Sequence, residues 1–232
     1  MNEEIQFWNE FAEEYAEIQS ESQVTIAKDV VTFLVEKEIL PTNTFVDLAG
    51  GCGRYVAEVI PFTQTYLLVD FSKEMLHIAA KQHSFSQLHL LEMAQKEFFE
   101  QTQNEQYDVV FTAMNPALDS KEELNELLRI TRKTACILRM IKEQDELFSP
   151  YEENRDTLMS KYKEWLGVPF EVQRFQYFTE EVISKSFFKD YFEMDISENE
   201  LEKMVAKHFK TDERLNRTEI VFELLIITKE RK

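Results

Sequence analysis

Residues 45–54 read FVDLAGGCGR, a short apolar run that leads into three glycines within four positions. The chain of 232 residues contains only four glycines in total. Average usage of about 7% would give roughly 16 in this length. A chain that is so sparing of glycine elsewhere has placed it where the backbone turns sharply or another group approaches closely. The pattern predicts a strand, a glycine-rich turn and the start of a helix.

Strands and helices alternate along residues 44–141, the part of the sequence that contains this turn. Strand-like runs occur at residues 44–48, 65–69, 87–91, 107–112 and 135–141. Helical stretches occur between them, at residues 54–60, 73–81 and 120–131. This alternation is typical of a parallel sheet with right-handed crossovers.

The two ends of the chain follow other patterns. Before the first strand, residues 4–18 and 23–38 have the periodicity of amphipathic helices. After residue 141 we expect a polar stretch at 143–165 and a strand at 170–178. Two helices should follow, at 179–188 and 197–208, and then a terminal hairpin formed by 209–215 and 219–228. We therefore expect a single domain over residues 1–232, with a helical cap at 1–40 and a substrate-side insertion or lid at 142–190.

The charge of the chain limits its partners. There are 26 basic and 44 acidic residues, a net charge of -18. The first 40 residues alone carry ten acids and two bases. Such a protein repels nucleic acids and anionic membranes, and its longest apolar runs are too short to span a bilayer. We predict no nucleic-acid partner and no membrane partner.

The cysteines and the start of the chain indicate the compartment. The two cysteines cannot form a disulfide framework, and no Cys/His cluster has zinc spacing. The opening MNEEI lacks the basic and apolar regions of a secretory signal. We therefore predict a cytoplasmic protein without a metal site.

An acid follows the glycine turn at a spacing that suits a nucleotide. Asp70 lies 23 positions after Asp47, at the end of the second predicted strand. The glycine turn lets a ligand lie against bare backbone at the edge of the sheet, and an acid at the next strand end can accept both hydroxyls of a ribose. A nicotinamide cofactor would suit the same pattern, but it expects a third glycine at position 56, which is Val56.

Four segments together resemble the class I S-adenosylmethionine-dependent methyltransferases. They are Val46–Arg54, Val69–Leu76, Gln106–Phe111 and the N-terminal Phe7–Tyr15. The resemblance extends over nearly the whole chain and is closest over residues 5–141. It implies an α/β, Rossmann-like, doubly wound fold, with a mostly parallel seven-stranded sheet, an antiparallel terminal strand, N-terminal cap helices and an insertion after the fifth strand.

The resemblance also implies S-adenosyl-L-methionine as cofactor, with S-adenosyl-L-homocysteine as product. Asp70 would hold the ribose, and Asp47 would orient either the glycine turn or the amine of the cofactor's methionine through hydrogen bonds. Ala49 replaces the family's first glycine, and Met93 stands where an aspartate usually reaches the adenine. The full set of expected cofactor-binding residues is Tyr15, Asp47, Ala49, Gly50, Gly51, Gly53, Asp70, Phe71, Met75, Met93 and Ala94.

For the methyl acceptor we expect a small, neutral or cationic molecule bound partly by residues 142–190. Trp8, Asn115 and Tyr151 are the candidate substrate-binding residues. Asn115 opens a partial match to the Asn-Pro-Pro-aromatic motif of amino-group methyltransferases. No catalytic residue is named, because the sulfonium carries the activation and the protein mainly aligns the reactants. We expect Cys52 to pack inside the turn and not to act as a nucleophile.

Two other functions fit parts of the pattern. A nicotinamide-dependent oxidoreductase would use the same turn and acid. A protein that binds S-adenosylmethionine without transferring its methyl group would fit the replacements at Ala49 and Met93. The prediction is a methyltransferase with an unknown acceptor.

Overall fold

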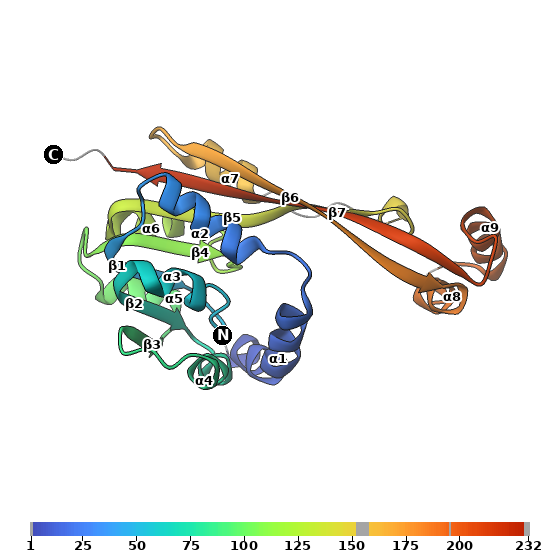
Figure 1. Cartoon of the computed structure of the whole chain (residues 1–232), viewed down its shortest axis with the longest axis horizontal. Helices are drawn as coiled ribbons and strands as arrows, with labels where there is room; N and C mark the ends of the chain where they lie inside the picture. Colours follow the sequence, from blue (N-terminus) through green and yellow to red (C-terminus); the bar gives the residue numbers. More distant parts are fainter. Residues whose placement is uncertain (1, 152–157, 195, 230–232) are drawn as a thin grey trace. The chain divides into compact units, whose positions relative to one another are not determined.

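A computed structural model describes residues 2–151, 158–194 and 196–229 (Figure 1). One seven-stranded sheet organises the chain, in the order β3-β2-β1-β4-β5-β7-β6. Its strands are β1 Thr42–Leu48, β2 Thr63–Asp70, β3 Leu88–Glu92, β4 Tyr107–Ala113, β5 Thr131–Asp145, β6 Glu171–Ser184 and β7 Glu213–Thr228.

The helices that accompany the sheet lie on both of its sides. The helices of the described residues are α1 Asn2–Glu21, α2 Ile26–Glu36, α3 Val56–Val59, α4 Lys73–Gln82, α5 Gln95–Gln101, α6 Lys121–Ile130, α7 Leu158–Trp165, α8 Lys185–Phe192 and α9 Glu198–His208, with 3-10 turns η1 Ile60–Phe62 and η2 Ser149–Tyr151. Within the described ranges, none of these helices has the length and apolar character needed to cross a membrane.

The register brings the carboxyl ends of four parallel strands to one edge. In β1, Leu48 pairs with Val69 of β2, and Asp47 pairs with Phe111 of β4. In β2, Asp70 pairs with Glu92 of β3. The strand β7 runs antiparallel. These features confirm the predicted Rossmann-like, mostly parallel sheet with an antiparallel strand, and they gather the loops after β1, β2, β3 and β4.

The chain divides into two compact units. The larger unit comprises Met1–Met140, Thr157–Phe175 and Phe222–Lys232, and the smaller comprises Ile141–Asp156 and Gln176–Val221. In the larger unit, aromatic rings of neighbouring central strands pack against one another. Phe45 of β1 lies 5.2 Å from Tyr66 of β2 and 5.8 Å from Phe111 of β4, measured between ring centroids.

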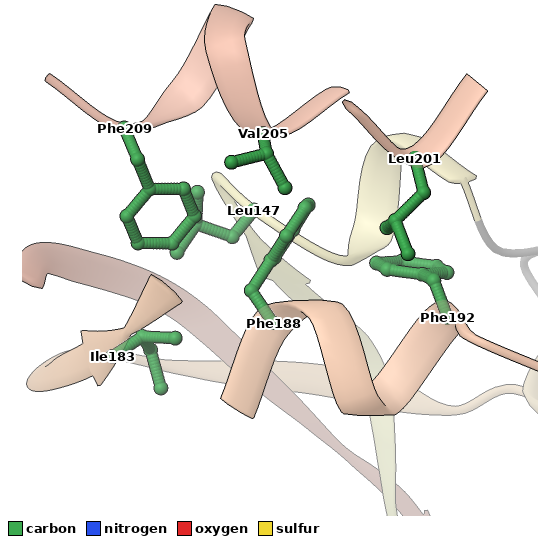
Figure 2. Packing of buried hydrophobic residues seen from close by; sticks show 7 residues of the cluster. All are labelled: Leu147, Ile183, Phe188, Phe192, Leu201, Val205 and Phe209. Atoms are coloured by element: carbon green, nitrogen blue, oxygen red, sulfur yellow. The ribbon is translucent and has the colours of Figure 1, made fainter. Parts of the chain in front are cut away.

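The smaller unit has an apolar core of its own (Figure 2). Phe188 and Phe192 of α8 face Leu201 and Val205 of α9. The remaining buried members are Leu147, Ile183 and Phe209. The side chain of Ser184 begins α8 by accepting a hydrogen bond from the Phe187 N–H at 3.1 Å.

Two predictions about the C-terminal third were wrong. A helix was expected over residues 179–188, but β6 continues to Ser184 and the helix begins only at Lys185. A hairpin was expected from residues 209–215 and 219–228, but Glu213–Thr228 is one continuous strand. Strand pairing over this length outweighs the local helical pattern. The predicted insertion at 142–190 accordingly contains all of β6, and its role as a lid stays a prediction.

Candidate active site

A pocket opens at the carboxyl edge of the parallel strands, within the larger unit. Its walls come from α1, from the glycine turn after β1, and from the segments that follow β2, β3 and β4. The lining residues are Glu4, Trp8, Tyr15, Leu48, Ala49, Gly51, Val69, Asp70, Phe71, Met75, Met93, Gln95, Ala113, Met114, Asn115, Pro116 and Ala117.

The glycine turn has a left-handed backbone at three positions. The φ angles are +56° at Ala49, +55° at Gly51 and +80° at Gly53. Such angles are free for glycine, whereas they strain a residue with a Cβ by about 1–2 kcal/mol. Ala49, which stands where the methyltransferases that the sequence resembles have a glycine, thus has a left-handed backbone of the kind that favours glycine. The helix that follows the turn begins at Val56, two residues later than the predicted start at Arg54, and it has only four residues.

Gly50 is needed for a different reason, which is space. A Cβ on Gly50 would lie 2.8 Å from Leu68 Cγ and 2.9 Å from both Cγ and Oδ2 of Asp47. The Asp47 carboxylate is itself buried and accepts a 2.7 Å hydrogen bond from the Tyr66 hydroxyl. Burial raises the pKa of Asp47 to about 7. Asp47 therefore supports the turn from inside the protein and does not line the pocket.

Asp70 is fixed at the end of β2 by two backbone donors. The Gly51 N–H donates to Oδ2 at 2.9 Å, and the Ser72 N–H donates to Oδ1 at 2.8 Å. Burial raises the pKa of Asp70, and these donors partly oppose that rise. A carboxylate has about four acceptor positions, so each oxygen can still accept a hydrogen bond from a ligand in the pocket.

The helix α1 packs on the glycine turn and on α4 (Figure 1). Ala12 is fully buried against Cys52 and Met75. The Cys52 Sγ lies 3.1 Å from the Met75 Sδ, and burial raises the pKa of the Cys52 thiol to about 11. The thiolate is therefore rare at neutral pH. This supports the prediction that Cys52 is a packing residue.

A polar contact joins α1 to the start of α4. The Ser72 hydroxyl accepts from the Met75 N–H at 3.2 Å as the N-cap of α4, and it donates to Asn9 Oδ1 at 2.7 Å. Asn9 Oδ1 also accepts from the Glu74 N–H at 3.3 Å. These hydrogen bonds thus connect the first turn of α4 to α1 at Asn9.

The pocket-facing side of α1 is aromatic. The rings of Trp8 and Tyr15 meet edge to face, with centroids 5.8 Å apart at 85°. Tyr15 also lies over the glycine turn, because a Cβ on Gly51 would be 3.7 Å from its Cε1. Burial raises the pKa of Tyr15. Both side chains line the pocket, as α1 was predicted to do.

The segment after β4 is held by an amide network. Asn115 is buried; its Nδ2 donates to Gln95 Oε1 at 2.7 Å, and its Oδ1 accepts from the Ala117 N–H at 2.9 Å. Gln95 Nε2 donates to the Ala117 carbonyl at 3.0 Å and to Glu123 Oε2 at 2.6 Å. Asn115 therefore shapes the pocket wall through its neighbours. Its predicted contact with an acceptor stays a prediction.

The pocket brings together most of the predicted site residues. Those that line it are Trp8, Tyr15, Ala49, Gly51, Asp70, Phe71, Met75, Met93 and Asn115. Asp47, Gly50, Gly53 and Ala94 are not among its lining residues. Tyr151 belongs to the smaller unit, where its hydroxyl lies 2.8 Å from His208 Nε2, and its role in acceptor binding stays a prediction.

Several lining residues were not predicted as site residues. Leu48, Val69 and Ala113 sit at the ends of β1, β2 and β4, so their position at the strand ends could have indicated them. Glu4 stands one helical turn before Trp8 and could have been found by the same periodicity. The others are Gln95, Met114, Pro116 and Ala117. Within the described residues, no group of three or more His, Cys, Asp or Glu side chains is arranged to hold a metal ion.

No protein-family model matches the chain, and no curated protein matches it. Solved structures do. A protein of Methanococcus maripaludis assigned as an S-adenosyl-L-methionine-dependent methyltransferase superposes with a TM-score of 0.55 at 14% identity, over 97% of this chain and 94% of its own. A protein assigned as a methyltransferase from Bacillus halodurans C-125 gives 0.53 at 15% identity, over 87% and 99%.

A third similar structure contains a bound ligand. DhpI, solved as its complex with SAH, superposes with a TM-score of 0.51 at 11% identity, over 98% of this chain and 96% of that one. At such identities the likeness concerns the fold. The sheet order, the antiparallel β7 and these superpositions together show that the chain has the fold of the class I S-adenosylmethionine-dependent methyltransferases.

Proposed function

We propose that the protein is an S-adenosylmethionine-dependent methyltransferase acting on a small molecule. The observation that carries the proposal is the glycine turn locked onto Asp70. The Gly51 N–H and the Ser72 N–H orient the carboxylate, and both Gly51 and Asp70 line the pocket. The fold supports the same function through its solved relatives.

The residues of the pocket fit this cofactor. Asp70 offers acceptor positions for ribose hydroxyls, and Gly51 carries no side chain where a ligand would lie against the turn. Phe71, Met75 and Met93 form an apolar wall beside them, suited to the flat face of an adenine. When bound, S-adenosylmethionine supplies an electrophilic methyl group on a sulfonium.

The chain itself contributes alignment and exclusion of water. The α1 helix covers one side of the pocket through Trp8 and Tyr15, and the fixed segment at Asn115 forms another wall. Holding an acceptor and a methyl donor in line, in a dry pocket, lowers the barrier without a charged catalytic group. This is consistent with the high pKa of the Cys52 thiol, which removes it as a nucleophile.

Calorimetric titration of the full chain tests the proposal. The protein should bind S-adenosylmethionine and S-adenosylhomocysteine and should not bind NADH. Asp70→Ala should weaken binding by about 1.5–3 kcal/mol, the scale of hydrogen bonds to a charged group. Glu58→Gln, which removes a charge from an exposed position on α3, should leave affinity unchanged. Binding of NADH alone would replace this function with the oxidoreductase alternative.

Turnover separates the enzyme from a protein that only binds the cofactor. Release of S-adenosylhomocysteine in the presence of an acceptor shows transfer. Because Asp70 also holds the Gly51 and Ser72 amides, the stability of Asp70→Ala is measured in parallel. A loss of affinity in a variant that is still folded assigns the effect to the ligand contact.

A further inference from the structure

We propose that the methyl acceptor is a small molecule that carries a protonated amine, recognised by the Glu4 carboxylate together with the rings of Trp8 and Tyr15. The methylated atom is a separate, uncharged nucleophile of the same molecule: its lone pair attacks the methyl carbon as the bond to the sulfonium sulfur breaks, and any proton it carries leaves to water. This inference rests on the proposed function, because it concerns the acceptor of that same pocket. Three observations carry it: the sign of the charges in the pocket, the partners of those charges, and the arrangement of the three side chains on α1.

The charges that line the pocket are all negative. Among its described lining residues the only acidic side chains are Glu4 and Asp70, and there is no lysine, arginine or histidine. Arg139 does not line the pocket, and its Nη1 donates to the Asn115 carbonyl at 3.1 Å. An acceptor that carries a carboxylate or phosphate would meet negative charge without a positive counterpart in the wall.

The two acids differ in their partners. Both oxygens of Asp70 accept backbone N–H groups at 2.8–2.9 Å. The Glu4 side chain is exposed, and within the described part of the chain it makes no hydrogen bond or ion pair. Glu4 is thus a pocket carboxylate whose charge the surrounding protein does not balance, and a cationic ligand would balance it.

The side chains that accompany Glu4 are suited to a cation. Glu4, Trp8 and Tyr15 are spaced by one turn and then by two further turns, so they lie on one face of α1. The rings of Trp8 and Tyr15 meet at 85° with centroids 5.8 Å apart. A cation beside a carboxylate and an aromatic face gains both Coulomb attraction and attraction to the ring quadrupole.

Glu4 comes from a different part of the chain than the glycine turn and Asp70, whereas Tyr15 of the same helix face lies over the glycine turn. The glycine turn and Asp70 lie at the ends of β1 and β2. Glu4 comes from the first turns of α1, and the Met114–Ala117 segment follows β4. If Glu4 instead served the amine of the cofactor, its removal would change cofactor affinity, and the experiment below includes that measurement.

The first test fractionates a small-molecule cell extract by charge. Each fraction is incubated with the full chain and S-adenosylmethionine that carries a labelled methyl group. We expect labelled product from the fraction retained on a cation exchanger. Label from only the neutral or anionic fractions overturns the inference alone. Lack of label in every fraction while calorimetry shows intact cofactor binding refutes the proposed methyl transfer, and the inference with it. A protein that does not bind S-adenosylmethionine refutes the proposed function instead.

The second test uses the labelled compound purified from the active fraction. Glu4→Gln keeps the size of the side chain and removes its charge. The KM for this compound should rise about two- to fivefold at low salt, the range expected when an exposed charge pair is lost and the rings remain, with kcat and cofactor Kd unchanged. Glu3→Gln is the matched control, because Glu3 is exposed on the same helix and does not line the pocket. Equal KM values for the two variants, or a weaker cofactor Kd in Glu4→Gln, would contradict the assignment.

Discussion

The replacement of Gly50 by alanine tests whether this glycine is required by packing. Its φ angle is not in the left-handed region, so backbone strain is not the issue. The added Cβ would lie 2.8 Å from Leu68 Cγ and 2.9 Å from the Asp47 carboxyl carbon. Both neighbours belong to the central strands β1 and β2, and Asp47 is further held by Tyr66. Neither can move without disturbing the core.

The expected cost follows from these contacts. Inserting a methyl group into a packed interior costs about 1–3 kcal/mol, and we expect about 2–3 kcal/mol for Gly50→Ala because the neighbours are pinned. At Gly51 the nearest atoms to a new Cβ are 3.7 Å and 3.9 Å away, which is ordinary contact. Gly51→Ala should therefore cost only the left-handed strain of about 1–2 kcal/mol. At Gly167 no atom lies within 4 Å, and alanine should be neutral.

Urea unfolding followed by tryptophan fluorescence measures these differences. Both tryptophans of the chain, Trp8 and Trp165, lie in the larger unit, so the signal reports the unit that contains the turn. The order of stability should be Gly167→Ala, then Gly51→Ala, then Gly50→Ala. If Gly50→Ala is as stable as Gly51→Ala, the argument from close approach to Asp47 is refuted.

Two further predictions concern α1 and Asp47. A chain that begins at Val24 should lose S-adenosylmethionine binding in calorimetry. Its Cys52 should also react with an aromatic disulfide reagent at about pH 8, because in the full chain Cys52 is only 2% exposed under α1 and burial raises its pKa to about 11, and removing α1 would relieve that burial. Unchanged affinity or an unreactive Cys52 would show that α1 does not cover the turn. Asp47→Asn should be more stable than the wild type at about pH 8. The difference between their free energies of unfolding should shrink by on the order of 2 kcal/mol from about pH 8 to about pH 5. The sign follows because the folded protein holds the Asp47 proton up to about pH 7, whereas the unfolded chain releases it near pH 4, so wild-type stability falls as pH rises through this window. Urea titrations of both proteins across this pH range check it, and a pH-independent difference would contradict the raised pKa.

The central part of the fold could be predicted from sequence because its signals are local. Each strand from β1 to β4 is a short apolar run, and Ser72 and Ser120 cap the helices that follow β2 and β4. In the C-terminal part the sequence predicted a strand at 170–178, a helix at 197–208 and a strand at 219–228, but not the full extents of β6 and β7. The strand β6 alternates exposed and half-buried residues over most of its length, so its apolar residues mark no single core face. Its extent, and that of β7, depends on pairing between distant segments.

Some features of the site could likewise be predicted from the sequence, and others could not. Asp70 and the glycine turn are recognisable because their residue types and spacing are tied to one kind of ligand. The sequence does not show that Gly50 is required by the lack of space for a Cβ and Gly51 by its left-handed φ angle. These reasons depend on the backbone angles and on which atoms of β1, β2 and α1 lie near each glycine. The link from Asn115 through Gln95 to Glu123 joins the loop after β4 to α5 and α6, so no local pattern marks it.

The contact of Asn9 with Ser72 has a thermodynamic consequence for any ligand of the pocket. Because α1 supplies Trp8 and Tyr15, the binding-competent protein is the one in which α1 is docked. The apparent affinity is therefore the intrinsic affinity multiplied by the docked fraction. By linkage, the ligand raises that fraction in return. Amide exchange along α1 would then slow on ligand binding, including at positions such as Ala12 that do not line the pocket.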